Sequence, residues 1–194
     1  SSNLLALTTR LRQATACPSI LTSQDIVSSK IERCIEIVDE LISQGEKVVI
    51  LSTFKEPIYQ LSRLLEHYQP LVSTGDTAES VFDDNNVRFQ NDPNSKIYLG
   101  TFGKCSTGIT LNAASYLIAI DENWTAAQNN QAWDRIYRVT NENPANITIL
   151  VCKDSIDERV HEITSTKREL SDYVVDGMQN ELSKSLQNEM LNII

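Results

Sequence analysis

The sequence has 194 residues, of which 41% are hydrophobic and 22% charged, so it is long enough for one α/β domain with a sizeable core and some helical additions. Its net charge of -9 argues against a generally basic nucleic-acid coat, and any contact with nucleic acid must therefore be local. No apolar run approaches the length of a membrane-spanning helix and the N-terminus lacks a signal-peptide pattern, so we expect no membrane partner.

The chain is expected to begin with an amphipathic helix over residues 3–16 that packs on the domain, and Cys17-Pro18 ends it. Its apolar residues recur with helical spacing: Leu4, Leu7, Leu11 and Ala14. A second helix starts at a pair with the form of a capping box, Ser29 and Glu32, and closes at Gln44-Gly45.

The middle of the chain alternates short apolar strands with helices. A buried strand is predicted over residues 47–54, followed by a helix with Pro57 in its first turn. This helix has an apolar inner stripe: Ile58, Leu61, Leu64 and Leu65. Further strands are predicted over residues 70–73 and 96–101, separated by an acidic stretch that we expect to be irregular.

Two more strands are predicted over residues 116–121 and 147–152, with a helix over residues 126–139 between them. The alternation of five apolar strands with helices implies an α/β fold whose parallel sheet of at least five strands is covered by helices on both faces. Ligands of such sheets bind beyond the carboxyl ends of the strands, which here carry the loops 101–108 and 121–124.

The last third of the chain is expected to be helical. Ser155 and Glu158 have the form of a second capping box, for a helix that runs to Arg168. From Met178 onward a last amphipathic stripe contains Leu182, Leu186 and Met190. This segment is either a brace that packs on the domain or an arm that contacts something else in a longer protein.

The predicted helix over residues 126–139 has two contrasting faces. Four long polar side chains share one stripe, because an α-helix has about 3.6 residues per turn. They are Gln128, Gln131, Arg135 and Arg138, and Trp133, Ile136 and Tyr137 lie opposite. The rigid guanidinium fork of arginine matches phosphate oxygens, so Arg135 and Arg138 are candidates for a phosphate clamp. The alternative is a solvated face tied by an ion pair between Asp134 and Arg138.

Cysteine and histidine residues indicate no metal site. The four cysteines are widely spaced and include no Cys-x-x-Cys pair: Cys17, Cys34, Cys105 and Cys152. This pattern suits a reducing intracellular compartment and offers no zinc site. The two histidines, His67 and His161, belong to no recognisable catalytic group.

Several separated blocks of the sequence resemble motifs V and VI of superfamily-two helicases, specifically those of Swi/Snf-type DNA translocases. They comprise Thr101, Gly103, Gly108-Ile109-Thr110-Leu111, Ala113-Ala114, Asn123-Trp124 and the run from Gln131 to Val139. Residues 11–21 also resemble the segment that precedes the second lobe in this family, with Cys17 in place of the usual histidine. The sequence departs from the family pattern at Phe82, where arginine is usual, and at Tyr137, where histidine is usual.

The resemblance implies the second RecA-like lobe of a two-lobed ATPase. In the family, ATP and magnesium are held mainly by a first lobe, with a phosphate-binding loop and a magnesium-holding acidic pair that this chain lacks, so we expect the chain alone to be inactive. Arg135 and Arg138 would act as arginine fingers on the γ-phosphoryl group, with Gln131 positioning nucleotide or water. Gly108 would let the loop backbone approach the nucleotide closely.

The same resemblance assigns to this lobe part of a grip on double-stranded DNA. Thr101 and Lys104 match a loop that touches the DNA backbone in the family, and Trp124 matches a tryptophan at the DNA-facing edge. A buried aromatic residue that stabilises its loop is an equally good interpretation of Trp124. Lys55, after the first strand, is a weaker candidate for a backbone contact.

The resemblance therefore predicts the second motor lobe of an ATP-dependent translocase on double-stranded DNA, with a first RecA-like lobe in the same protein as its partner. The location would be the cytoplasm or the nucleus, or the host-cell cytoplasm if the protein is viral. Alternatives are a helicase lobe acting on RNA or single strands, and a non-catalytic protein-interaction module on the same scaffold. The expected parts are an N-terminal helical extension (residues 1–27), the RecA-like lobe (28–170) and a C-terminal helical brace (171–194).

Overall fold

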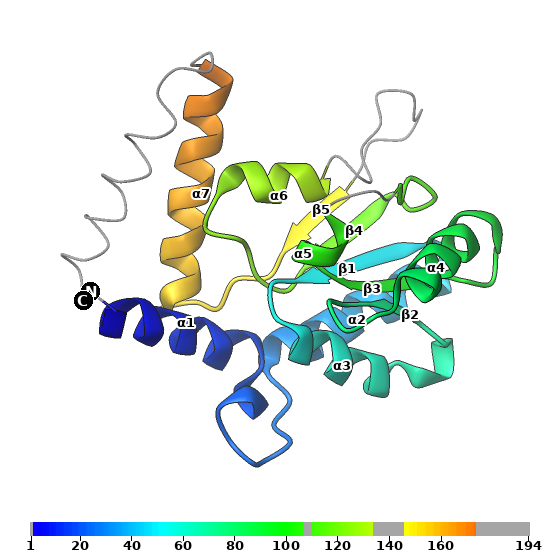
Figure 1. Ribbon diagram of the computed structural model, residues 1–194, viewed down its shortest axis with the longest axis horizontal. Helices are drawn as coiled ribbons and strands as arrows, with labels where there is room; N and C mark the ends of the chain where they lie inside the picture. The colour runs from blue at the N-terminus through cyan, green and yellow to red at the C-terminus, as the bar shows by residue number, and fades with distance from the viewer. Residues whose placement is uncertain (1, 107–109, 134–145, 174–194) are drawn as a thin grey trace.

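A parallel sheet forms the centre of the molecule (Figure 1). The computed structural model describes residues 2–106, 110–133 and 146–173, and within these ranges five strands pair in the order β2-β3-β1-β4-β5. The strands are β1 Val48–Ser52, β2 Leu71–Ser73, β3 Ile97–Thr101, β4 Tyr116–Ala119 and β5 Asn146–Ile149. The α-helices are α1 Ser2–Ala16, α2 Ser29–Ser43, α3 Lys55–Leu64, α4 Glu79–Asn91, α5 Phe102–Cys105, α6 Ala126–Trp133 and α7 Ile156–Tyr173, with 3-10 turns η1 Pro18–Ile20 and η2 Glu66–Tyr68. The predicted α/β class and parallel sheet are confirmed.

Helices cover both faces of the sheet because its central strands are apolar on both sides. Along β1, Val49 and Leu51 join one core with residues of α4, α5 and α6, whereas Val48 and Ile50 join a second core with residues of α2 and α3. β1 is buried along its whole length, as expected for the middle strand of a parallel sheet. No helix in the described ranges is both long and apolar enough to cross a membrane.

The N-terminus of α2 is capped by Ser28 rather than by the predicted Ser29. Ser28 Oγ accepts a hydrogen bond from Ile31 N at 3.3 Å and donates one to Ala16 O at 2.9 Å, so the cap also anchors the end of α1. At the other end of α2, Gly45 has a φ of +83°, which glycine adopts without strain, and the predicted stop is confirmed.

The acidic stretch that we expected to be irregular is the helix α4, and the prediction is wrong. Phe82 and Phe89 point inward, with the buried Asn85 between them interrupting the apolar period. Asn85 Nδ2 donates hydrogen bonds to Val72 O at 2.8 Å and to Ser73 Oγ at 3.3 Å. Because the hydrogen-bond partners of this buried amide lie on β2, the local sequence pattern of α4 does not indicate that Asn85 is buried.

Helix α1 packs on the domain through its polar side instead of its apolar stripe. Leu7 and Leu11 are 43% and 42% exposed, whereas Thr8 and Arg12 are only 9% and 4% exposed. In Figure 1, α1 runs along the base of the molecule, with α7 rising from it. The predicted helix is confirmed, but the face expected to pack is wrong. Leu64, in the stripe predicted for α3, is likewise exposed.

At the start of α7, Ser155 and Glu158 both accept backbone hydrogen bonds, but not in the pattern of the predicted capping box. Ser155 Oγ accepts a hydrogen bond from Asp157 N at 3.1 Å, and Glu158 Oε2 accepts one from Asp154 N at 3.0 Å. The helix runs to Tyr173, beyond the predicted end at residue 168. The predicted C-terminal brace lies outside the described residues from position 174 onward.

Gly100 in β3 has no room for a side chain. An added Cβ would lie 2.4 Å from Cys105 Sγ and 3.3 Å from Leu51 Cδ2. We expect Gly100→Ala to lower the free energy of unfolding by about 1–3 kcal/mol, because overpacking displaces neighbouring side chains. Adding Cys105→Ala should restore most of the loss, and urea denaturation of the single and double variants measures both effects.

Gly103→Ala is the matched control, because no atom lies within 4 Å of an added Cβ there. Equal unfolding midpoints for Gly100→Ala and Gly103→Ala would contradict this packing.

Candidate functional site

The carboxyl ends of the strands bring distant parts of the sequence to one edge of the sheet. β1 ends at Ser52 and β3 at Thr101, and these two residues are partners in the sheet register. On the other side of β1, β4 ends at Ala119 and leads through Ile120 to Asp121. Because β1 lies between β3 and β4, the two loops predicted to bind ligands start from strands on either side of it.

The side chain of Asp121 forms hydrogen bonds and an ion pair with residues from several elements at this edge. Its Oδ1 accepts hydrogen bonds from Ser52 Oγ at 2.7 Å and from Thr53 N at 2.8 Å. Its Oδ2 lies 3.3 Å from Nη2 of Arg12, in an ion pair whose side chains are only 3% and 5% exposed. The carboxylate therefore joins the ends of β1 and β4 to each other and to helix α1.

The guanidinium of Arg12 contacts the loops that follow β1 and β4. Its Nη2 donates to Thr53 Oγ1 at 3.3 Å and to the carbonyl oxygen of Glu122. Its Cζ lies 5.6 Å from the ring centroid of Phe54 and 5.0 Å from that of Trp124, within the range of cation–π attraction. Burial lowers the pKa of Arg12, although nearby carboxylates oppose the shift.

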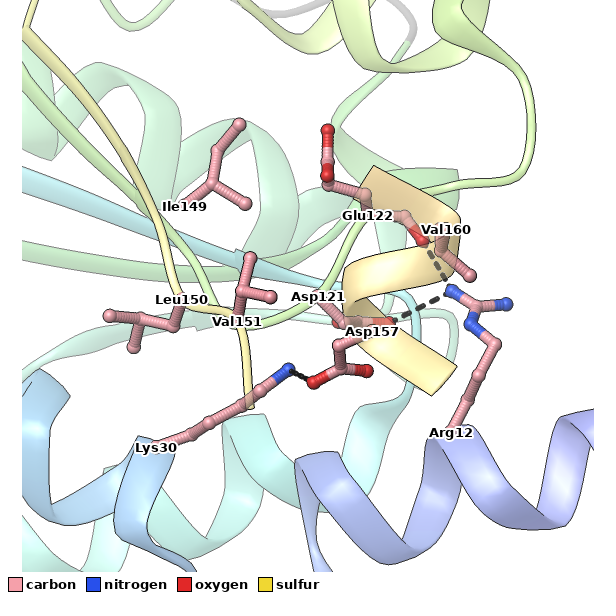
Figure 2. Close-up of a pocket in the computed structure, with 9 residues that line it drawn as sticks. All are labelled: Arg12, Lys30, Asp121, Glu122, Ile149, Leu150, Val151, Asp157 and Val160. Atoms are coloured by element: carbon pink, nitrogen blue, oxygen red, sulfur yellow. Dashed lines mark hydrogen bonds and ion pairs between the residues drawn. The ribbon is translucent and has the colours of Figure 1, made fainter. Parts of the chain in front are cut away.

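A second buried ion pair lies beside the first, around the small cavity shown in Figure 2. Lys30 pairs with Asp157 and donates a hydrogen bond to Ile120 O at 2.8 Å. Asp157 Oδ1 also accepts from Thr15 Oγ1 at 2.8 Å. We refer to the five charged residues that line this cavity as the buried charge cluster: Arg12, Lys30, Asp121, Glu122 and Asp157.

Helix α7 holds the same cluster from the other side through Glu122. The Oε2 atom of Glu122 lies 2.7 Å from His161 Nδ1, and its Oε1 accepts a hydrogen bond from Thr164 Oγ1 at 3.2 Å. Sequence reasoning missed this cluster. The available signals were an acidic pair directly after an apolar strand and an arginine on the polar side of an amphipathic helix.

Two of the predicted residues of the loop after β3, Thr101 and Lys104, lie among the described residues and are largely covered. Thr101 is 8% exposed, as the last residue of its strand. Lys104 lies on α5, with a side chain that is 17% exposed and Nζ 4.3 Å from the ring centroid of Phe82. Its ammonium forms an ion pair at 2.6 Å with Glu79, whose side chain is 73% exposed. Lys104 thus carries a structural contact that its sequence setting did not indicate.

Lys55 opens α3 and is also paired. Its Nζ lies 2.8 Å from Asp76 Oδ2, which accepts a further hydrogen bond from Tyr59 OH at 2.9 Å. The hydrogen bond with Asp76 raises the pKa of Lys55 and lowers that of Asp76. Lys55 follows Phe54, so it lies next to one of the two rings that contact Arg12.

Helix α6 is fastened to the loop that carries Trp124. Asn129 is fully buried, and its side chain accepts from Asn123 N at 2.8 Å and donates to Asn123 O at 3.1 Å. Trp133 packs edge to face on Phe102, with ring centroids 5.8 Å apart. Gln131 is exposed, so the described part of α6 has the predicted polar outer side and aromatic inner side.

The remaining candidates lie outside the described residues. They are Gly108, Arg135 and Arg138, together with Asp134 of the alternative ion pair. The structure therefore brings together Thr101, Trp124 and the Phe54-Lys55 turn at one edge and does not test the arginine pair.

A metal site and a reactive thiol are two further kinds of chemistry to consider in the described part of this edge. No cluster of three or more His, Cys, Asp or Glu side chains in it could hold a metal ion. Burial raises the pKa of Cys105 to about 12, so this thiol is protonated at neutral pH and is a poor nucleophile. All four cysteines are free.

Comparison with known proteins places the chain among helicases. It matches the family described as helicase conserved C-terminal domain over residues 29–140. The ATP-dependent helicase ULS1 of Saccharomyces cerevisiae is 28% identical over 154 residues, which cover 77% of this chain and 10% of that protein. An ATP-dependent helicase of Mycoplasma pneumoniae is also 28% identical, over 98% of this chain and 19% of that protein. The chain thus spans less than a fifth of the length of either relative.

Solved structures of Swi/Snf-type ATPases share the fold. The Sulfolobus solfataricus SWI2/SNF2 ATPase core in complex with double-stranded DNA aligns with a TM-score of 0.71 and 25% identity, covering 89% of this chain and 37% of that one. The separate C-terminal domain of the Sulfolobus solfataricus enzyme aligns with a TM-score of 0.65 and 22% identity, covering 90% of this chain and 74% of that one, and this likeness supports the fold alone.

Removing one charge from the cluster should destabilise the domain strongly. We expect Asp121→Asn to lower the free energy of unfolding by about 3 kcal/mol or more, because it leaves the buried Arg12 without its ion pair. Urea denaturation measures the change.

Asp25→Asn is the matched control, because it removes an ion pair with Arg63 whose side chains are 61% and 62% exposed. Its midpoint should stay near that of the unmodified chain. Similar losses in the two variants would show that burial of the Asp121 pair has no energetic consequence.

Proposed function

This chain belongs to the helicase conserved C-terminal domain family and has the fold of the second, RecA-like lobe of Swi/Snf-type ATPases, and we propose that it is the second motor lobe of an ATP-dependent translocase on double-stranded DNA. The observation that carries the proposal is the family match over residues 29–140, from the start of α2 past the end of α6. That stretch contains every predicted nucleotide-facing residue: Gly108, Gln131, Arg135 and Arg138.

In this proposal Arg135 and Arg138 act as arginine fingers. When bound, ATP supplies the γ-phosphoryl group, and the two guanidinium groups stabilise the charge on its oxygens as the bond breaks, a role worth about a thousandfold or more in rate. Gly108 lets the loop backbone approach the nucleotide, which a first lobe holds together with magnesium. The anchoring of α6 through Asn129 and Trp133, with Gln131 exposed, supports this assignment because it gives the helix a rigid outer face.

The proposed DNA contacts are Thr101, Lys104, Trp124 and Lys55. They are supported by their common position, since they end or follow β3, β4 and β1 at the same edge of the sheet. The related Sulfolobus ATPase core was solved with double-stranded DNA, and this favours a duplex over RNA or a single strand as the substrate.

We propose that this chain alone does not hydrolyse ATP, because the phosphate-binding loop and the magnesium-holding residues belong to the first lobe of the same protein. A non-catalytic interaction module on the same scaffold is the alternative. A phosphate-binding loop and an Asp-Glu pair upstream in the full gene product would support the motor, and their absence would support the module. The free cysteines favour a reducing location, the cytoplasm or the nucleus.

Arg138→Ala tests the arginine fingers in the full-length protein. We expect the DNA-stimulated rate of ATP hydrolysis to fall by about a thousandfold, since the charge that stabilises the transition state is lost. The affinity for duplex DNA, measured by fluorescence anisotropy, should change little.

Arg159→Ala is the control for the loss of an arginine, because Arg159 pairs with Glu162 at the solvent-facing side of α7. Wild-type turnover in the Arg138 variant would remove the finger assignment.

Lys104→Ala tests the DNA grip. We expect weaker binding and a dependence of log Kd on log salt that is less steep by about 0.9, because one phosphate contact is lost. Glu79→Gln should act in the opposite direction, since it frees the Lys104 ammonium from its ion pair.

Binding of both variants to duplex DNA and to RNA is measured across a salt series. An unchanged slope in Lys104→Ala would exclude this residue as a phosphate contact.

A further inference from the structure

Arg12 is a single side chain that joins two loops predicted to touch DNA. It lies on α1, 41 residues before Thr53 in the sequence and 109 residues before Asp121. Its hydrogen bonds reach the turn after β1 through Thr53 and the loop after β4 through Asp121 and the Glu122 carbonyl. The Asp121 carboxylate also joins these turns directly, through Thr53 N and Ser52 Oγ, so the guanidinium adds a second bridge beside it.

Arg12 also contacts two aromatic rings, one in each of the two loops. Phe54 and Trp124 are both half-buried at the edge, with the Cζ of Arg12 5.6 Å and 5.0 Å from their ring centroids. A planar guanidinium can contact aromatic rings while its edge donates hydrogen bonds, which a lysine ammonium cannot do in the same way. Arg12 is therefore a direct packing partner of the partly exposed Trp124 ring.

The Lys30–Asp157 pair in the same cluster differs in this respect. It is also buried, with side chains 3% and 7% exposed. Lys30 contacts Asp157 and the Ile120 carbonyl, and among the described residues it contacts no aromatic ring. Stability alone would need only a paired charge at either position. The aromatic contacts of Arg12 add a geometric role that Lys30 does not have.

We propose that Arg12 is a positioning residue for the DNA grip, which holds Trp124 and the Phe54-Lys55 turn at the spacing that the duplex backbone requires. Arg12 contacts neither DNA nor nucleotide and acts through the Trp124 ring and Thr53. This inference rests on the proposed function, since it takes Trp124 and Lys55 as DNA contacts.

The first test follows the Trp124 ring in this chain. The chain has two tryptophans, so a Trp133→Phe background leaves Trp124 as the only tryptophan, which is excited at a wavelength that the tyrosines do not absorb. Arg12→Ala and Arg12→Lys should shift the Trp124 emission to longer wavelength and raise its acrylamide quenching about twofold, because the ring loses its cation–π partner. Phe54→Leu, which removes the other ring contact of Arg12 and keeps the arginine, should change the Trp124 emission in the same direction by less, and it replaces Arg12→Ala if that variant fails to fold.

The second test measures DNA use by the full-length protein. The concentration of duplex DNA that gives half-maximal ATP hydrolysis should rise about fivefold in Arg12→Lys, while hydrolysis without DNA stays unchanged. Lys30→Met is the matched control, since it breaks the neighbouring buried pair. It should lose stability while the Trp124 fluorescence and the DNA requirement stay as in the unmodified protein.

The outcomes separate this inference from the function on which it rests. Equal effects of Arg12→Lys and Lys30→Met on both readouts would overturn the positioning role and leave only a stabilising ion pair. An unmodified full-length protein whose ATP hydrolysis ignores DNA would overturn the proposed function and the DNA part of this inference. In that case, a change of Trp124 fluorescence in the Arg12 variants but not in Lys30→Met would still support the conclusion that Arg12 positions the Trp124 ring.

Discussion

The structure depends on the pairing of carboxylates that are buried at the carboxyl end of β4. Asp121, Glu122 and Asp157 are only 3%, 5% and 7% exposed, and a buried charge is tolerated when it is paired and hydrogen-bonded. Arg12 and Lys30 supply opposite charges from α1 and α2, and α7 adds further partners. One requirement, a partner for each of these carboxylates, thus fastens three helices to the edge of the sheet from which the candidate binding loops start.

This requirement also decides how α1 lies. Turning the helix to bury Leu7 and Leu11 would gain at most about 1.5–3 kcal/mol for each leucine. The same turn would withdraw Arg12 and leave Asp121 unpaired, and breaking a buried ion pair costs about 3–5 kcal/mol, with further hydrogen bonds lost. Because the leucines are already more than half covered, the ion pair dominates and the apolar stripe stays partly exposed.

An acidic lobe can still hold a phosphate backbone if its local cations are available. Lys55 forms an exposed pair, since its side chain and that of Asp76 are 49% and 58% exposed, whereas the Lys104 side chain is only 17% exposed. Exposed ion pairs are worth less than about 1 kcal/mol, so an approaching polyanion can replace the carboxylate of Asp76 at little cost. The net charge of -9 therefore lowers non-specific attraction to DNA more than it opposes the proposed grip at this edge.

The sequence alone determined the α/β class, the parallel sheet and the edge from which the candidate binding loops start, because continuous apolar runs and stops such as Gly45 are local signals. Only the tertiary structure decided that α4 is a helix and which face of α1 is buried. Asn85 finds its partners on β2, and Arg12 finds Asp121 109 residues away. Local sequence governs which backbone segments are regular. Which polar side chains can be buried depends on partners from distant segments, and only the folded chain supplies them.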